Sequence, residues 1–477
     1  MSRSWRRLWR SRIPCAAAWL AVASATVASS AAPAFGAVMT EKLFPLPARL
    51  DPHDAEPSRL DLRRVTFGQR GTQLWLTVRT QGEWAAGAID ADGICVTLRR
   101  NQMLGRMCVG RDARGRAVLR YSRASDGVLG RARIVQAVVE RRDGRSLSAR
   151  LYPRTLRLPY AGVRWFVASR SVGEGCDGRC EDRVPDIGAY TARIGALGGP
   201  TCFGAAARAR RRSCVDPDLR RAVIPGPDAA EITPDLPCRR VPKTRYSAIE
   251  PCDFGDLVDG RKPAVALIGD SHSAHWRAAL DVAAKAAGWR AVSLTSPGCS
   301  FSTEVYPAPP PIPARCHGHS LEALTWLRRH PTVKSIVTSS SAGRGLSVGG
   351  YLAIWRRVPA SVRRIYVIRD VPRVSYKTAD CVRAVRRRGR SSVGVCSVAR
   401  RGAFSADASA QAAALAGGRV RLLDFTPFFC YGSRCYPVIG GAYVYRDFNH
   451  MNPVFNTTLG PYLLRALGGA PRDRPSR

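Results

Sequence analysis

The stretch VALIGDSHSAHW, residues 265–276, decides how the second half of the chain is interpreted. Four apolar residues end abruptly in GDSH (269–272), and an alanine-rich segment of helix-forming residues follows. One interpretation is helix capping, because Asp and Ser at a helix start accept hydrogen bonds from backbone N–H groups that lack partners. The other is that Ser271 is a nucleophile held at the carboxyl end of a strand. The rest of the chain has to distinguish the two.

The period of the sequence changes near Pro263, where apolar strands begin to alternate with helices. Strands are expected at 263–268, 290–296, 333–340, 363–370 and 419–425, with helices at 275–288, 319–330, 351–358 and 406–417. This alternation predicts an α/β domain, a three-layer arrangement with helices on both faces of a parallel sheet. Ligands of such sheets bind at the carboxyl ends of the strands. Ser271 lies just past the first strand, which favours the nucleophile.

A nucleophilic serine needs a base, and the base needs an orienting group. The best candidates lie in YRDFNHMNP (445–453), where Asp447 and His450 are three residues apart. On a turn or at a helix start, this spacing lets the carboxylate meet the imidazole. The alternative is again capping, in which Asp447 or Asn449 begins a helix through 456–467. The DxxH pattern is weak alone, and strong beside GDSH at the other end of an α/β domain.

These two motifs resemble those of the SGNH (GDSL-like) hydrolase superfamily. The similarity is closer to SGNH domains fused to membrane acyltransferase-3 domains, which begin with a strand and a GDSHxxHW-like block. Such domains end with a cysteine pair, a tyrosine and D-x-N-H. Here FFCYGSRCYPVIGGAYVYRDFNHMNP (428–453) repeats that order, with Cys430, Cys435 and Tyr445 before the D-x-N-H. The resemblance spans about 260–468 and does not reach the N-terminal β-region, which is not recognised.

By position, the resemblance implies a catalytic triad and an oxyanion hole. Ser271 would be the nucleophile, His450 the general base, and Asp447 the group that orients and stabilises it. The oxyanion donors would be the backbone N–H groups of Ser271 and of Gly298 in TSPGCS (295–300). Superfamily members often add an Asn after the third strand, but VTSSSAGRG (337–345) contains none. A Ser side chain or a water could substitute there, or the hole is weaker.

Two further histidines follow the serine closely. His272 and His275 are interpreted as structural residues, and the alternative for His275 is that it lines the pocket. The sequence offers no cofactor motif. A metal site is the less favoured interpretation of CDGRC (176–180) and CHGH (316–319), because neither has a matching second half-site.

The net charge of the chain limits the kinds of partner that it could bind. The 477 residues carry a formal net charge of +39, from 69 Arg and 6 Lys against 36 acidic residues. Arginines are spread over the whole length without a nucleic-acid-binding motif, so attraction to anionic envelope polymers is favoured over nucleic acid.

The first 37 residues read as a secretory signal peptide, with a retained membrane anchor as the alternative. The 14 later cysteines fall in neighbouring couples, which suits disulfides of an oxidising compartment. The couples are 95/108, 176/180, 202/214, 238/252, 299/316, 381/396 and 430/435.

The expected organisation has four parts. Residues 1–37 are the signal peptide, 38–170 a β-sandwich-like domain, 171–258 a Cys/Pro/Gly/Arg-rich connector, and 259–477 the SGNH hydrolase-like domain. Short alternating strands separated by Gly, Asp or Asn turns predict the sandwich. Trp75, Trp84 and Trp165 could stack on sugars there, although a core position is the favoured interpretation.

The function expected from these features is that of a secreted serine esterase or O-acyltransferase. Its substrates would be O-acyl groups, with O-acetyl foremost, on cell-envelope or extracellular glycans. A separate membrane acyltransferase could supply the acyl group. One alternative is a catalytically weak or inactive SGNH domain that serves as a polysaccharide-binding envelope protein. A further alternative is an envelope-binding protein whose positive charge is itself the function.

Overall fold

The computed structural model describes the chain between residues 46 and 468 with gaps. The described residues are 46–52, 54, 60–84, 93–158, 160–171, 180–199, 202–208, 214, 216–232, 235–236, 238–240, 249–257, 263–307, 309, 312–391 and 394–468. The expected signal peptide and Cys176 lie outside these ranges. Within them, no helix combines the length and the apolar character needed to cross a bilayer.

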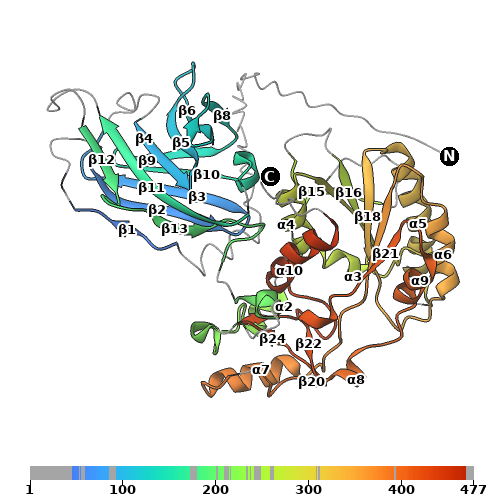
Figure 1. Cartoon of the computed structure of the whole chain (residues 1–477). Coiled ribbons are helices and arrows are strands. Elements are labelled where there is room, and N and C mark those ends of the chain that lie inside the picture. Colours follow the sequence, from blue (N-terminus) through green and yellow to red (C-terminus); the bar gives the residue numbers. More distant parts are fainter. Residues whose placement is uncertain are drawn as a thin grey trace, which may run out of the picture. The chain divides into compact units, whose positions relative to one another are not determined.

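The N-terminal half is built from two antiparallel sheets (Figure 1). The first sheet has the order β1 (Arg49–Leu50), β2 (Leu62–Arg70), β3 (Gln73–Thr80), β10 (Ser146–Leu151), β9 (Val138–Asp143). The second has the order β12 (Cys180–Val184), β11 (Gly162–Ser171), β4 (Ile94–Arg99), β5 (Met103–Arg111), β6 (Ala117–Ser125), β7 (Val128–Leu129), with β13 (Tyr190–Arg193) on β11 and β8 (Arg133–Val135) on β6. A 3₁₀ turn, η2 (Pro153–Leu156), precedes β11. Strands β12 and β13 come from the segment that the sequence analysis placed in the connector.

Both sheets bury alternate residues in one shared core. Val65 and Phe67 of the first sheet cluster with Val96 and Leu98 of the second. Among the three tryptophans considered for sugar stacking, Trp84 and Trp165 are buried in this core. Trp75 is partly exposed, and the guanidinium groups of Arg70 and Arg150 lie 5.4 and 5.6 Å from its ring centroid. The core interpretation is therefore right for two of the three.

The C-terminal half contains a mixed sheet. Its strand order is β14 (Arg239–Arg240), β15 (Cys252–Gly255), β17 (Arg290–Thr295), β16 (Ala264–Gly269), β18 (Val333–Ser339), β19 (Arg364–Ile368), β21 (Val420–Leu423). The five strands from β17 to β21 pair in parallel, as predicted. β14 and β15 are antiparallel additions, because β15 hydrogen-bonds to the outer edge of β17. The sheet is therefore mixed, with the predicted parallel strands side by side and two antiparallel strands at one edge.

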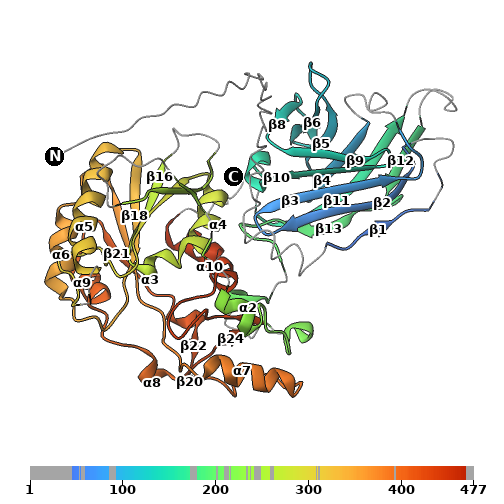
Figure 2. The same ribbon diagram turned by 180° about the vertical axis from the view of Figure 1, so that it is seen from behind.

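Helices pack against both faces of this sheet (Figures 1 and 2). Val265 and Leu267 of β16 cluster with α4 and α10, whereas Ala266 and Ile268 cluster with α5, α6 and α9. This alternation follows from the period of two in a strand, which sends neighbouring side chains to opposite faces. The helices are α3 (Ser271–Ala274), α4 (Arg277–Ala287), α5 (Ile312–Arg329), α6 (Val348–Arg356), α7 (Thr378–Arg387), α8 (Arg400–Ala403), α9 (Ala408–Ala416) and α10 (Pro453–Ala466).

Much of the cysteine-rich middle segment packs into the same C-terminal core. Phe203 and Leu219 belong to the cluster that contains Trp276 and Leu459. The short elements here and near the chain end are η3 (Gly204–Arg208), η4 (Pro217–Leu219), α2 (Pro227–Ile232), β20 (Val398–Ala399), η5 (Thr426–Phe428), β22 (Cys430–Tyr431), β23 (Arg434–Cys435), β24 (Val438–Ile439) and β25 (Ala442–Tyr443). A segment without clear periodicity thus supplies part of a folded core.

Six of the predicted cysteine couples are disulfide-linked. They are 95–108, 202–214, 238–252, 299–316, 381–396 and 430–435. Cys180 is also disulfide-bonded, but Cys176 lies outside the described residues. In CHGH, Cys316 is taken up by its disulfide, and the His319 Nε2–H donates to the Leu294 carbonyl at 3.0 Å. Both groups are therefore already engaged.

Candidate active site

Ser271 stands at the end of a buried strand, and its neighbour performs the capping. Asp270 is the N-cap of α3, and its Oδ1 accepts the His272 N–H at 2.8 Å. Its Oδ2 accepts from the Ser300 hydroxyl and the Ser341 N–H, both at 3.0 Å. Because the aspartate satisfies the helix start, the Ser271 hydroxyl is not needed for capping.

The sharp turn from β16 into α3 requires a glycine. Gly269 has a φ of +133°, a region that L side chains rarely adopt. A Cβ atom there would lie 2.5 Å from the Ser273 Oγ and 3.0 Å from the Ser339 carbonyl oxygen. The Ser273 hydroxyl itself donates to the Ile268 and Ser339 carbonyls, at 2.8 and 2.7 Å. The turn that holds Ser271 is therefore fixed on the β18 side.

A loop near the chain end brings Asp447 and His450 to the serine. The loop is closed by backbone hydrogen bonds from Arg446 N to His450 O and from Asn452 N to Val444 O. Asp447 Oδ1 accepts the N–H groups of Asn449 and His450, at 2.9 and 2.7 Å. Helix α10 begins later, with Asn452 as its N-cap. The capping alternative for Asp447 and Asn449 is thus wrong.

Three side chains form a continuous hydrogen-bonded chain. His450 Nδ1 lies 2.8 Å from Asp447 Oδ2, and His450 Nε2 lies 2.8 Å from Ser271 Oγ. Burial opposes ionisation of Asp447, but the His450 ring and two backbone N–H groups outweigh it and lower the pKa of Asp447 to about 2. An ionised carboxylate can only accept, so Nδ1 carries the proton and Nε2 is free to accept the Ser271 hydroxyl proton.

The proposed oxyanion donors come from neighbouring strand ends. Gly269 and Thr295 are register partners of β16 and β17, so Ser271 and Gly298 leave the sheet at the same edge. Gly298 has a φ of +79° in a turn closed by the Cys299 N–H and the Ser296 carbonyl, at 3.0 Å.

The segment after β18, which lacks the expected Asn, bonds to buried carboxylates and hydroxyls instead. The Ser340 hydroxyl lies 2.7 Å from Ser300 Oγ and 2.6 Å from the Tyr351 hydroxyl. The Ala342 N–H donates to Asp370 Oδ2 at 2.8 Å. The Ser340 side chain is therefore engaged within the domain and is not a ready substitute for an amide donor.

A second histidine–carboxylate pair lies beneath the first. His272 Nδ1 donates to Asp370 Oδ1 at 2.6 Å, and both side chains are buried. The His272 ring centroid is 4.7 Å from that of His450. Burial disfavours the charged form of His272, but the Asp370 carboxylate outweighs it and raises the pKa of the imidazole. His272 Nε2 is buried without a hydrogen-bond partner among the described residues.

His275 completes a group of three imidazoles. Its ring centroid lies 5.3 Å from that of His272 and 6.2 Å from that of His450. Its Nδ1 accepts the Met451 N–H at 3.4 Å, which leaves the proton on Nε2. Burial, reinforced by the two neighbouring histidines, lowers the pKa of His275 well below its ordinary value. His275 is therefore a neutral, buried residue that holds the loop of His450.

Asp370 was not singled out from the sequence. It follows the parallel strand β19 by two residues, and the carboxyl ends of parallel strands are where such domains collect functional groups. That position is the only signal that could have found it. Its pairing with His272, 98 residues earlier, depends on the strand order.

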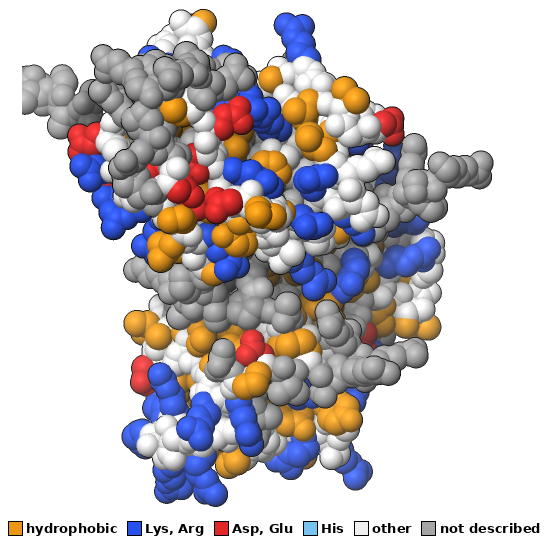
Figure 3. Space-filling model, turned by 60° about the vertical axis from the view of Figure 1, so that its left-hand side comes forward, with side chains coloured by type: hydrophobic (Ala, Val, Ile, Leu, Met, Phe, Trp, Pro, Cys, Tyr) orange, Lys and Arg blue, Asp and Glu red, His pale blue; other side chains and the backbone are white. Residues whose placement is uncertain are grey.

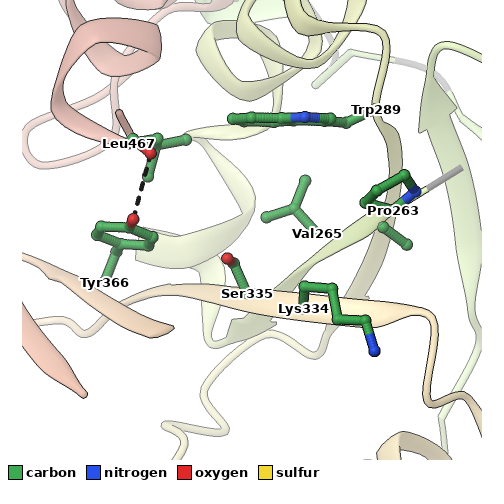
Figure 4. A pocket seen from close by; sticks show the side chains of 8 residues that line it. Pro263, Val265, Trp289, Lys334, Ser335, Tyr366 and Leu467 are labelled. Carbon is green, nitrogen blue, oxygen red and sulfur yellow. Dashed lines mark hydrogen bonds between the residues drawn. The ribbon is translucent and has the colours of Figure 1, made fainter. Parts of the chain in front are cut away.

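A cavity also lies at the opposite end of the parallel strands (Figure 4). Its volume is about 150 Å³, and it is lined by Val265, Trp289 and Tyr366, with Lys334 and Ser335 of β18. The Tyr366 hydroxyl donates to the Leu467 carbonyl at 3.2 Å. Since Val265 is the second residue of β16 and Ser271 follows the end of that strand, this cavity is remote from the hydrogen-bonded triad along the strand direction.

A family model matches the region of the chain that contains both motifs. Residues 237–465 match the family model described as the SGNH domain fused to AT3 domains. No curated protein matches the chain. A solved structure of a lipopolysaccharide acetyltransferase periplasmic domain from Salmonella ser. Paratyphi A is similar over 43% of this chain and 84% of that one, with 12% identity and a TM-score of 0.37. The resemblance inferred from GDSH and DxxH is confirmed by the match of residues 237–465 to this family model.

Proposed function

We propose that the protein is a serine esterase or O-acyltransferase, with Ser271 as nucleophile, His450 as general base and Asp447 as the orienting carboxylate. The observation that carries this proposal is the chain of two 2.8 Å hydrogen bonds from Ser271 through His450 to Asp447. A base within hydrogen-bonding distance of the nucleophile, itself oriented by a third group, is the arrangement that activates a hydroxyl.

The chemistry follows from these positions. His450 Nε2 takes the Ser271 proton as Oγ bonds to the acyl carbon of the donor ester. The ester oxygen then leaves with that proton, and an acyl-serine remains. Water or a sugar hydroxyl next gives its proton to His450 and attacks the acyl carbon. The bond between that carbon and Ser271 Oγ then breaks, and His450 returns the proton to Ser271 Oγ, so the free acid or the acylated sugar leaves and the enzyme is restored. The backbone N–H groups of Ser271 and Gly298 would donate to the oxyanion in both steps.

The cellular location is proposed from the N-terminal sequence and the disulfides. A signal-peptide-like N-terminus and six disulfide couples suit a secreted or envelope-associated protein. The substrate would be an O-acylated glycan, with O-acetyl as the expected group, and a separate membrane acyltransferase could supply the acyl group. Basic side chains are spread over the face shown in Figure 3, which would favour anionic envelope polymers as surroundings.

A second candidate function is a polysaccharide-binding protein with weak or no turnover. The segment at 337–345 lacks the Asn donor, and the Ser340 hydroxyl is engaged with Ser300 and Tyr351. Removal of one oxyanion donor costs about 10²–10³ in rate in serine hydrolases. The intact triad favours the enzyme over this alternative.

The test is covalent labelling with a fluorophosphonate probe, combined with hydrolysis of p-nitrophenyl acetate. We expect wild type to label at Ser271 and to turn over, and Ser271→Ala to lose both while its melting temperature changes little. Ser125→Ala is the matched serine control for labelling, because Ser125 is exposed on β6 in the N-terminal half and belongs to neither motif. Wild type that neither labels nor turns over would favour the binding protein instead.

A further inference from the structure

A second cavity opens beside the triad's carboxylate. Its volume is about 300 Å³, and Asp447 is part of its wall. The remaining lining residues are Pro227 and Glu231 of α2, residues 375, 376, 378–380 and 383 in and before α7, and Tyr443, Arg446 and Phe448 of the loop that carries His450. Three segments far apart in the sequence therefore converge at one edge of the candidate active site.

Two aromatic rings form one side of this cavity. Tyr376 is 78% exposed, and its ring centroid lies 4.3 Å from that of Phe448 at an interplanar angle of 37°. A backbone hydrogen bond of 2.8 Å from Val374 N to Phe448 O joins the two loops that carry the rings. An aromatic face left in solvent beside hydrogen-bonding groups is suited to stacking against a ligand.

The charged groups of the cavity nearly cancel. Its acids are Glu231, Asp380 and Asp447, and its bases are Arg383 and Arg446. Arg383 is already paired with Asp380 and with Asp228 outside the cavity. Arg446 bonds to Asp235 at 3.1 Å and lies 3.9 Å from Asp447. In a chain of net charge +39, this cavity is not a basic site.

These features select a ligand class. An anionic polymer would meet three carboxylates and two guanidinium groups that already have partners. An uncharged saccharide instead offers an apolar ring face for Tyr376 and hydroxyl groups that can donate to carboxylates, for which charge-assisted hydrogen bonds are strong. Asp447 also bonds to the imidazole that contacts Ser271. A saccharide held in the cavity would thus contact the carboxylate that orients His450.

We propose that the cavity between α2, α7 and the His450 loop is a subsite for an uncharged saccharide unit of the glycan substrate. This proposal rests on the proposed esterase or acyltransferase function and narrows its substrate class. The Tyr376 ring provides the stacking platform, and Glu231 and Asp380 accept hydrogen bonds from sugar hydroxyls. The positive net charge of the chain would then attract anionic polymers to surfaces outside this subsite.

The experiment compares two kinds of substrate in wild type and in Tyr376 variants of the full chain. The substrates are acetylated mannan oligosaccharides, which are uncharged, and p-nitrophenyl acetate, which has no saccharide. Loss of one aromatic stacking contact is expected to lower the ratio of their kcat/KM values about tenfold in Tyr376→Ala. Tyr376→Phe, which keeps the ring, should restore most of the ratio. Tyr431→Ala is the matched control, because Tyr431 is 70% exposed on β22 and does not line the cavity.

Acetylated pectin oligosaccharides, which carry carboxylates, test the charge preference. We expect a lower kcat/KM than for the mannan series in wild type. An unchanged ratio in Tyr376→Ala, or a preference for pectin that Tyr376→Ala does not alter, would overturn the subsite. Calorimetric binding of deacetylated mannan oligosaccharides to wild type and Tyr376→Ala keeps this test separate from the chemistry. Binding that depends on Tyr376 would support the subsite even in a protein that fails to label at Ser271, and equal or absent binding would argue against it.

Discussion

Two histidine–carboxylate pairs lie side by side among the described residues of the C-terminal half, with the centroids of their imidazole rings 4.7 Å apart. The two pairs differ in exposure and in their hydrogen-bond partners. The His450–Asp447 pair lies on a loop, with side chains 18% and 39% exposed. The His272–Asp370 pair is buried at the strand ends, with side chains 0% and 3% exposed. Only the outer histidine has its second ring nitrogen on a hydroxyl, that of Ser271.

The difference is consistent with the proposed catalytic role of the outer pair and with a structural role of the inner pair. A general base must be neutral before it takes a proton, and it must be able to carry charge afterwards. Asp370 outweighs burial and raises the pKa of His272, which shifts that imidazole toward the charged form that cannot accept a proton. Asp370 also accepts the backbone N–H groups of Ala342 and Val371, so the inner pair joins the loops after β18 and β19. The inner pair is thus a support for the floor of the site.

The largest expected effect separates the two histidines. His450→Ala should lower turnover of p-nitrophenyl acetate by about 10⁴–10⁶, since triad members act as one unit. Adding Ser271→Ala should cost little more for the same reason. The measurement is steady-state hydrolysis, with thermal melts to show that folding is kept. His330→Ala is the matched control, because the His330 ring stacks on Trp326 at 3.8 Å and bonds to its carbonyl. Full turnover in His450→Ala would break the assignment of the outer pair.

The next prediction compares the same substitution at the two carboxylates. Asp447→Asn should lower turnover by about 10²–10⁴, because it spoils the orientation and charge stabilisation of His450, and it should cost less stability than the same change at the buried Asp370. Asp370→Asn should lower the free energy of unfolding by about 3–5 kcal/mol, because it removes one partner of the buried His272–Asp370 pair. Urea unfolding and kcat of the folded fraction measure both. Equal losses of stability in the two variants would remove the distinction between the pairs.

The outer pair and the serine could be predicted from the sequence because their signals are local. GDSH places Ser271 directly after a strand, and DxxH places a carboxylate and an imidazole on one short loop. The neighbouring cysteine couples are local in the same sense, because the two partners of each couple are separated by 5–17 positions in the sequence. Short separations leave few alternative partners.

The inner pair and the antiparallel strands depend on the order of the sheet. Asp370 meets His272 because β18 is the only strand between β16 and β19, and the sequence does not state that order. Strands β14 and β15 are two and four residues long, within a segment rich in Cys, Pro and Arg. Such short strands carry no measurable alternation, so only their pairing with β17 reveals them.

The smallest expected effects concern pH, and the two pairs should respond in opposite directions. Hydrogen bonds from His450 and two backbone N–H groups overcome burial and lower the pKa of Asp447 to about 2, from an ordinary value of 3.8. Because the folded state favours the ionised carboxylate, Asp447 stabilises the fold at pH values above about 4. This stability is lost as the pH falls from about 4 to about 2. Asp370 overcomes burial and raises the pKa of His272 above 6.5. That stability is complete below pH 6.5 and is lost as the pH rises through the raised pKa.

Variants that do not titrate isolate these contributions. Asp447→Asn should differ from wild type in unfolding free energy by a constant amount above about pH 4, and the difference should shrink toward pH 2. His272→Gln should show its full difference below pH 6.5, and the difference should shrink at higher pH. The groups that face His272 are Asp270, Asp370, Arg344, His275 and His450. Each variant keeps the other neighbours of the substituted residue. Subtracting its unfolding free energy from that of wild type at each pH therefore removes their common contribution. The unfolding free energies are measured from urea unfolding followed by tryptophan fluorescence. A His272→Gln difference that grows with rising pH would mean that the inner imidazole is neutral in the folded protein, and the contrast between the two pairs would then rest on burial alone.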